Sequence, residues 1–500
     1  MIINLIQKSV QNLNGPTLIT FSKSSSQKEK PAEILMKELS KVLATSVSDK
    51  VITGTTNETV LFRELNFLGY KNVIVVGLGK SSDIDHEKVR QASAAAYEGL
   101  KSSKANEAVI HFDGLSSSVT TAALYMKAVV EGLQLAAYSF DELKSKKADK
   151  PYSATIHISS AHASDKKVKD SFEQGLILSQ CVNFSRNLGD LPGNLMTPKI
   201  LAEKTQAAFK GTSVKVQVWD KVRLKKEKMG GLLGVSNGSD QEPRFIIMEY
   251  KGAKASEKPI VFVGKGLTFD CGGISIKPSA AMEEMKYDMC GGANVIGTML
   301  AIAKLKLKMN VVGLVPATEN LVNGSATKPG DVHTARNGKT FEVNNTDAEG
   351  RLILADALSY ATELEPKAII DAATLTGAMV MALGNIHTGY FTRSQDLVKK
   401  VNAAAQTSGE LTWQMPLTDY HVSDMKGTFA DLSNISSGKG AGSATAAAFL
   451  EQFVGEGIPW AHFDIAGTGW AVGNRLNYCP KKGASGVMVR TFVELAKSLA

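Results

Sequence analysis

The feature that most constrains the fold is a repeated alternation of short apolar runs with helical patterns. The apolar runs are rich in β-branched residues and bounded by Gly or Pro, which is typical of buried strands. Strands that alternate with helices indicate parallel sheets covered by helices. The predicted strands lie at residues 71–79, 107–112, 153–159, 258–266, 310–317 and 367–377, and the predicted helices at 85–101, 293–305 and 351–364.

A long helical pattern at 163–194 divides this α/β sequence into two parts. Ser164 is expected to cap its start, and Gly189 and Pro192 are expected to end it. We therefore predict two domains, each a mixed or mostly parallel sheet flanked by helices. The predicted parts are an N-terminal domain (1–165), a connecting helix (166–190) and a C-terminal domain (191–500).

Composition excludes several protein classes. Hydrophobic residues make up 43% and charged residues 21% of the 500, which is an ordinary globular composition. We expect no signal peptide, because the first residues show no basic n-region, no long apolar h-region and no small-residue cleavage site. We expect no membrane partner, because no apolar run approaches the ~18 residues of a membrane span. The four cysteines show no CxxC spacing, which favours reduced thiols and a cytoplasmic location. The net charge of +8 and the basic stretch 220–230 leave a nucleic-acid-binding regulatory role as an alternative to a solvated helix face.

The segment 344–352, NNTDAEGRL, places two carboxylates two residues apart. An Asn-Gly pair at 337–338 predicts a hairpin that leads into it. If 345–349 is extended, Asp347 and Glu349 point to one side, with only small residues on the other, and their Cα atoms are about 7 Å apart. Two converging carboxylates need a metal ion, a shared proton or solvent between them.

A second segment, 263–295, favours the metal interpretation. It begins as a buried strand and then carries Lys265, Asp270, Lys277 and Asp288 among glycines that allow close backbone approach. Ligands of open α/β sheets bind at the carboxyl ends of strands. Acids and cations at such ends suggest oxygen-rich coordination of two divalent ions, a device that activates water. A His-based mononuclear zinc site is unsupported, since the sequence has no HExxH motif.

Together these motifs resemble those of the leucyl aminopeptidase (cytosol aminopeptidase) family of two-metal exopeptidases. NTDAEGRL is similar to the family's signature octapeptide, and VGKGLTFDCGGISIKP with MKYDM is similar to its partner motif. The resemblance covers roughly 170–500 and is weaker over 1–165. It implies a macro-like N-terminal domain with a structural or oligomer-forming role and a phosphorylase/hydrolase-like catalytic domain.

The resemblance also implies roles for individual residues. The implied metal ligands are Lys265, Asp270, Asp288, Asp347 and Glu349, of which Asp270 and Glu349 would bridge two ions. Lys277 would be a charged electrophile beside the scissile carbonyl, and Arg351 would hold a bicarbonate ion that acts as general base. The residues implied to bind substrate are Met285, Asn345, Thr374, Leu375, Gly377 and Ala466.

The implied activity is release of N-terminal residues, leucine-type but broad, from short peptides by a metal-activated water. The implied cofactors are two divalent ions per subunit, Zn²⁺, Mn²⁺ or Mg²⁺, and a bicarbonate ion. The implied assembly is a homo-hexamer, a dimer of trimers. Cys271 and Cys290 stand where Thr or Ser is expected at least as often, and we interpret them as small buried side chains rather than thiol ligands.

Overall fold

The computed structural model describes residues 1–25, 31–116, 118–145 and 152–500. Within these ranges the chain forms two compact units, each with its own sheet. The first comprises Met1–Gln180 and Gly473–Pro480, and the second comprises Cys181–Val472 and Lys481–Ala500. No helix in the described ranges is both long and apolar enough to cross a bilayer.

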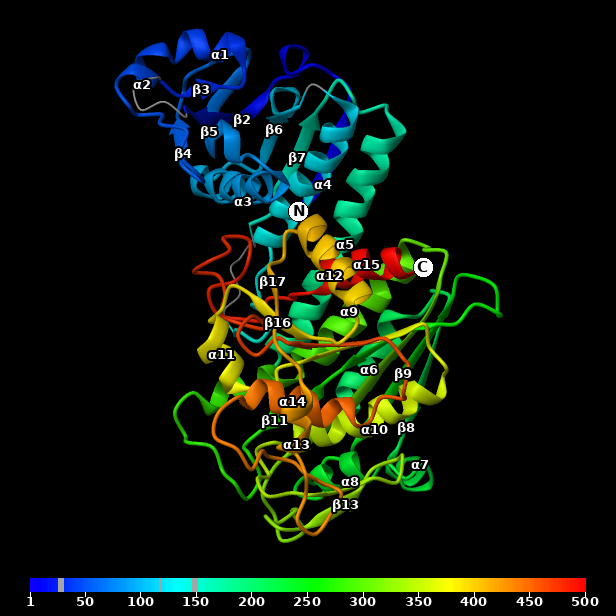
Figure 1. Cartoon of the computed structure of the whole chain (residues 1–500). Helices are drawn as coiled ribbons and strands as arrows, with labels where there is room; N and C mark the ends of the chain where they lie inside the picture. Colours follow the sequence, from blue (N-terminus) through cyan, green and yellow to red (C-terminus); the bar gives the residue numbers. More distant parts are fainter. Residues whose placement is uncertain (26–30, 117, 146–151) are drawn as a thin grey trace. The chain divides into compact units, whose positions relative to one another are not determined.

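The first unit is built on a mostly parallel sheet. Its parallel strands, in spatial order, are β1 (Ile2–Ile6), β7 (Thr155–Ser159), β6 (Glu107–His111), β2 (Gly15–Ser24) and β5 (Tyr70–Lys80). Two antiparallel strands, β3 (Glu33–Ile34) and β4 (Thr59–Phe62), pair with β2 and β5. One apolar face is covered by α3 (His86–Ser103) and α4 (Val119–Ala136), and the other by α1 (Lys37–Val42) and α2 (Ala44–Ser48) (Figure 1).

The long helix predicted after the first unit's last strand is α5 (Lys166–Asp190). The expected cap at Ser164 is wrong. Instead the Asp165 side chain accepts from the backbone N–H of Lys167 at 2.9 Å, and its carbonyl accepts from Lys169 at 3.0 Å. A carboxylate at this position is also stabilised by the positive end of the helix dipole, because it carries a negative charge that a serine hydroxyl lacks.

The second unit contains a larger mixed sheet. Its strand order is β17 (Thr412–Gln414), β16 (Thr388–Phe391), β19 (Trp460–Asp464), β15 (Ala368–Ala373), β10 (Ile260–Gly264), β12 (Asn310–Asn320), β9 (Arg244–Lys251) and β8 (Val214–Trp219), with β11 (Gly266–Asp270) beside the end of β12. The central strands β19, β15, β10 and β12 are parallel, whereas β16 and β9 run antiparallel to them. The predicted α/β class is thus confirmed.

Helices cover both faces of this sheet (Figure 1). One face carries α9 (Cys290–Lys304), α15 (Val489–Leu499) and α12 (Gln395–Ser408), and the other carries α10 (Gly350–Glu363), α14 (Gly442–Glu451) and α8 (Gly230–Ser236). Shorter helices are α6 (Pro198–Ala208), α7 (Lys221–Lys226), α11 (Gly377–Leu383) and α13 (Asp419–Ser423). The predicted Asn-Gly hairpin is confirmed by β13 (Val332–Thr334) and β14 (Thr340–Glu342), which pair antiparallel, and β18 (Leu432–Ser433) extends them.

Candidate active site

The parallel strands of the second unit bring polar side chains to one edge of the sheet. Lys265 follows β10 directly, Asp270 ends β11, Asn320 ends β12, Thr374 follows β15 and Asp464 ends β19. These are the carboxyl ends of the strands, where open α/β sheets bind ligands. The fold therefore gathers residues from positions 265 to 464 at a single place.

The segment around Asp347 adopts a different conformation from the one predicted. Residues 345–348 form a turn closed by the Ala348 N–H and the Asn345 carbonyl at 3.2 Å. Glu349 is helical and caps α10, so the expected extended strand over 345–349 is wrong. The turn is held by Asn434, 89 residues away, whose Nδ2 donates to the Asn345 carbonyl at 2.6 Å.

Position 350 is a glycine for a different reason from the one predicted, which was a thin face of an extended strand. A Cβ on Gly350 would lie 2.6 Å from Lys265 Nζ and 2.7 Å from Lys265 Cε. The glycine is needed because the lysine side chain crosses the first turn of α10 there. The prediction that the helix begins here, with Arg351 in its first turn, is confirmed.

Two lysines and four carboxylates meet at this edge. Lys265 Nζ lies 2.8 Å from Asp288 Oδ2 and 2.9 Å from Glu349 Oε1. Lys277 Nζ lies 2.7 Å from Asp270 Oδ2 and 2.5 Å from Asp347 Oδ1. The structure thus brings together all the predicted metal ligands and Lys277, although they come from two segments far apart in the sequence.

The cluster has more negative than positive charge. Four carboxylates face two ammonium groups, and Lys265, Asp270, Asp288 and Glu349 are all buried. Burial, with Asp270 adding to it, raises the pKa of Glu349 to about 8, and burial raises the pKa of Asp288 to about 6. Burial opposes the charge of Lys265, but the carboxylates around it raise the pKa of its ammonium group. The shortage of positive charge explains why acid and base pKa values move upward together.

The donor set fits a divalent cation. One carboxylate oxygen each of Asp270, Asp347 and Glu349 lies within 4.8 Å of the other two. Glu349 Oε2 is buried and has no hydrogen-bond partner among the described residues. Oxygen donors at this spacing and an unbalanced negative charge are what hard divalent ions require.

The supporting hydrogen bonds fix the orientation of the carboxylates. Asp270 Oδ1 accepts from Asn320 Nδ2 and from the Gly272 N–H, both at 2.8 Å. Thr374 Oγ1 donates to Asp288 Oδ1 at 2.7 Å, and its carbonyl accepts from Lys265 Nζ at 3.1 Å. Sequence reasoning missed Asn320, because nothing near position 320 marks it as a partner of Asp270.

Arg351, two residues after Glu349, is also buried. Its Nη1 donates to the Asn434 carbonyl at 2.6 Å, whereas its Nε has no partner among the described residues. Burial lowers the pKa of this guanidinium to about 10. A buried cation with an open donor has the properties of an anion-binding group.

The cluster opens into a cleft of about 410 Å³. Its walls include five of the predicted substrate-binding residues, namely Met285, Thr374, Leu375, Gly377 and Ala466. Asn345 is not among the described residues that line it, and its Oδ1 instead accepts from the Asp347 N–H at 2.8 Å. The walls also include Trp470, which sequence reasoning did not select. The cleft thus combines an apolar wall with a charged floor.

Comparison with protein families matches both units. The model of the cytosol aminopeptidase family catalytic domain matches residues 183–493, and that of the family's N-terminal domain matches residues 18–147. A probable cytosol aminopeptidase from Bdellovibrio bacteriovorus is 69% identical over 498 residues, which is 99% of each chain. Another from Nitrosococcus oceani is 43% identical over 437 residues, which is 87% of this chain and 86% of its own.

Solved structures show the same fold. A mutant of tomato leucine aminopeptidase has a TM-score of 0.87 at 31% identity, and the match covers 99% of this chain and 96% of that one. The bottromycin maturation enzyme BotP in complex with Mn has a TM-score of 0.85 at 28% identity, covering 97% of this chain and 99% of its own.

Proposed function

Because the chain belongs to the cytosol aminopeptidase family, we propose that it releases N-terminal residues from short peptides with a leucine-type, broad preference. Membership makes the protein a peptidase, a hydrolase of peptide bonds. The observation that carries the proposal is the cluster of four carboxylates and two lysines at the floor of a cleft.

The residues that would hold two divalent cations are Lys265, Asp270, Asp288, Asp347 and Glu349. Asp270, Asp347 and Glu349 would supply the closest group of oxygen donors, since one carboxylate oxygen of each lies within 4.8 Å of the other two. When bound, such ions act as Lewis acids on a carbonyl oxygen and lower the pKa of a water molecule. We favour Zn²⁺, Mn²⁺ or Mg²⁺, and the presence of Mn in BotP supports a divalent ion.

Lys265 has to change its protonation state in this proposal. In the structure it is the ammonium partner of Asp288 and Glu349. A lysine donates to a metal only as a neutral amine, so uptake of a cation would release the proton that now balances these acids. Each divalent ion would bring two positive charges for the one proton released from Lys265, so its uptake would reduce the shortage of positive charge in the cluster.

Lys277 would remain charged and serve the substrate. It is only partly buried, with 21% of its side chain exposed, and it lines the cleft. An ammonium fixed by Asp270 and Asp347 can stabilise negative charge that develops on a carbonyl oxygen, without reorganisation during the reaction. This is the role expected of an electrophile beside the scissile bond.

Arg351 would hold a bicarbonate ion, which supplies proton-transfer chemistry when bound. The unpartnered Nε of Arg351 supports this assignment. The cleft wall at Met285, Thr374 and Ala466 would accept the first side chain of the peptide. We further propose a homo-hexamer, a dimer of trimers, that works in the cytoplasm.

The proposal is tested by hydrolysis of a leucine anilide in the presence of Mn²⁺ or Zn²⁺. Asp347→Asn and Glu349→Gln each remove one negative oxygen donor and keep the side-chain size. We expect kcat/KM to fall by at least about 10³-fold, the equivalent of several kcal/mol of transition-state stabilisation. Full activity in either variant would contradict the proposal. A control variant, Glu203→Gln, changes an exposed acid of α6 and is expected to behave as wild type.

A nucleic-acid-binding role is the second candidate. Arg223, Lys225 and Lys226 are exposed along α7, although Arg223 pairs with Glu227 at 2.5 Å. Binding through such a surface should weaken steeply with salt. A gel shift with duplex DNA that shows no complex at moderate salt would remove this candidate.

A further inference from the structure

Trp470 is the only aromatic side chain among the described residues that line the cleft. The other large apolar side chains there are aliphatic or carry a thioether: Met282, Met285, Leu375 and Val380. Trp470 is half-buried, so part of its indole stays open. A flat indole offers an aromatic ligand a ring contact, which an aliphatic side chain cannot do. The orientation of Trp470 therefore decides what the cleft can recognise in this way.

Two side chains of the second unit hold the indole of Trp470 in one orientation. The Trp470 Nε1–H donates to Glu284 Oε2 at 3.1 Å. The indole also stacks on Tyr287, with ring centroids 5.8 Å apart and ring planes 16° from parallel. Tyr287 is itself buried, and Lys286 Nζ lies 5.0 Å from its ring centroid and donates to the Asp190 carbonyl at 2.7 Å. The indole is thus fixed by its polar atom and by one stacked ring.

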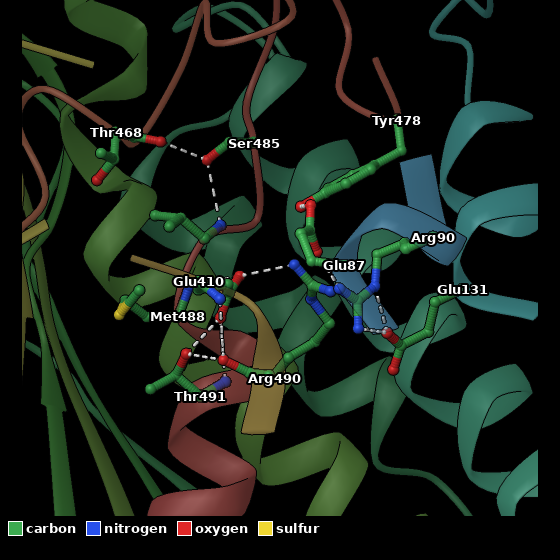
Figure 2. Close-up of polar contacts among 12 residues, drawn as sticks. Glu87, Arg90, Glu131, Glu410, Thr468, Tyr478, Ser485, Met488, Arg490 and Thr491 are labelled. Atoms are coloured by element: carbon green, nitrogen blue, oxygen red, sulfur yellow. Dashed lines mark hydrogen bonds and ion pairs between the residues drawn. The ribbon is translucent and has the colours of Figure 1, made fainter. Parts of the chain in front are cut away.

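The backbone next to Trp470 is fixed as well. Ser485 Oγ donates to the Thr468 carbonyl at 2.6 Å, a contact that Figure 2 shows. The Ser485 N–H donates to the Gly469 carbonyl at 2.9 Å, and Trp470 and Ala484 form an antiparallel bridge. All five residues belong to the second unit. Trp470 therefore keeps its place in the cleft wall through contacts made within its own unit.

The backbone before Trp470 packs against the wall proposed to accept the first side chain of a peptide. A Cβ on Gly469 would lie 3.1 Å from Thr374 Cγ2, so a glycine favours this close approach. Tyr287, on which the indole stacks, follows Met285 by two residues. Trp470 thus continues the wall to which Met285 and Thr374 contribute.

We propose that Trp470 is a specificity-determining residue that favours peptides with an aromatic first residue. This inference rests on the proposed function and names a substrate class within the broad preference stated there. An aromatic side chain gains a ring contact with the indole in addition to the burial of apolar area, whereas leucine gains only the burial. Because the indole is already held by Glu284 and Tyr287, binding need not order it.

The first experiment measures kcat/KM for phenylalanine, leucine and alanine anilides. Trp470→Leu keeps an apolar side chain and removes the aromatic ring. We expect the phenylalanine-to-leucine ratio of kcat/KM to fall about 3- to 10-fold, the size of one aromatic contact. The value for the alanine anilide should change less than the value for the phenylalanine anilide. Trp413→Leu is the matched control and should leave the ratio unchanged, because Trp413 is 61% exposed on β17 and is not among the described residues that line the cleft.

The second experiment separates the ring of Trp470 from its hydrogen bond to Glu284. Trp470→Phe loses the Nε1–H but keeps an aromatic ring, so the ratio should stay within about twofold of wild type. An equal fall of the ratio in Trp470→Phe and Trp470→Leu would overturn the inference, because the hydrogen bond alone would then explain it. An unchanged ratio in Trp470→Leu, including an equal loss on all three substrates, would overturn it too. Failure of the wild-type chain to release any of the three residues would overturn the proposed function instead.

Discussion

Asp371 and Glu349 are both buried carboxylates of the second unit, yet their surroundings differ in kind. Asp371 Oδ1 pairs with His462 Nδ1 at 2.5 Å, and Asp371 Oδ2 accepts from Trp460 Nε1 at 2.7 Å. Each oxygen of Asp371 thus has a donor on β19, the neighbouring strand. Glu349 has one oxygen on Lys265, and its other oxygen has no partner in the described part of the chain.

This difference in hydrogen-bond partners indicates that Asp371 has a structural role and Glu349 a functional one. A buried carboxylate with a donor for each oxygen is already stabilised by the protein. A buried carboxylate with an open oxygen, in a cluster short of positive charge, is stabilised fully only when a cation is added. We therefore expect changes at Asp371 to alter folding stability and changes at Glu349 to alter metal binding and activity.

The largest expected effect is that of metal removal. A chelator should reduce kcat/KM by at least about 10³-fold. Mn²⁺ at 100 times its Kd should stabilise the folded protein by about 2.7 kcal/mol, measured as a rise in Tm by scanning calorimetry. The rise should be much smaller in Glu349→Gln and unchanged in Asp371→Asn. An equal rise in all three proteins would remove the distinction between the two acids.

Asp371→Ala should produce the largest loss of stability. It leaves His462 and the Trp460 indole N–H buried without their acceptor. Breaking a buried pair in this way costs about 3–5 kcal/mol, which urea unfolding would measure. Asp371→Asn keeps one acceptor oxygen and should cost less. A loss below about 1 kcal/mol in Asp371→Ala would show that the pair adds little to stability.

Gly350→Ala should affect the site more than the fold. The new Cβ would displace Lys265 Nζ, so we expect kcat/KM to fall about 10-fold or more and the cost of overpacking to be about 1–3 kcal/mol. Gly324→Ala is the matched control, because a Cβ there meets no atom within 4 Å. Normal activity in Gly350→Ala would mean that Lys265 is free to move without consequence.

The smallest expected effect is a change with pH in the stability that the Asp371–His462 pair adds to the fold. Burial opposes the charge of His462, but Asp371 raises the pKa of this imidazole above 6.5. Because the folded-state pKa is the higher one, the stabilisation is fully present below pH 6.5 and is lost as the pH rises through the folded-state value. The difference in unfolding free energy between wild type and Asp371→Asn should therefore narrow as the pH is raised above 6.5, as urea unfolding at several pH values would show. A difference that widens would contradict the assigned direction.

The strands and helices that position the site could be predicted because each has a local signal. The apolar run at 258–266 gave β10, and the periodic stretch at 351–364 gave α10. Strand β9 and strand β19 were not predicted, although Arg244–Lys251 and Trp460–Asp464 are apolar enough to be buried. Local patterns of this kind follow the period of the backbone and carry no information on distant partners.

The conformation of Asp347 and Glu349 could not be predicted for the same reason. Alternating acids and small residues suit both a strand and a turn, and the choice is made by the Asn434 side chain. The pairing of Asp371 with His462 likewise depends on the register of β15 against β19, which residues 91 positions apart do not reveal. The resemblance to a known family supplied the proposed metal ligands, which local reasoning left open.

The junction between the turn at 345–348 and α10 restricts how this chain can change in length. Glu349, which pairs with Lys265, and Arg351, which donates to the Asn434 carbonyl, lie at the start of one helix. One residue inserted between them would rotate Arg351 by about 100° around the helix axis. A single insertion or deletion at residues 349–351 would therefore separate the two halves of the site.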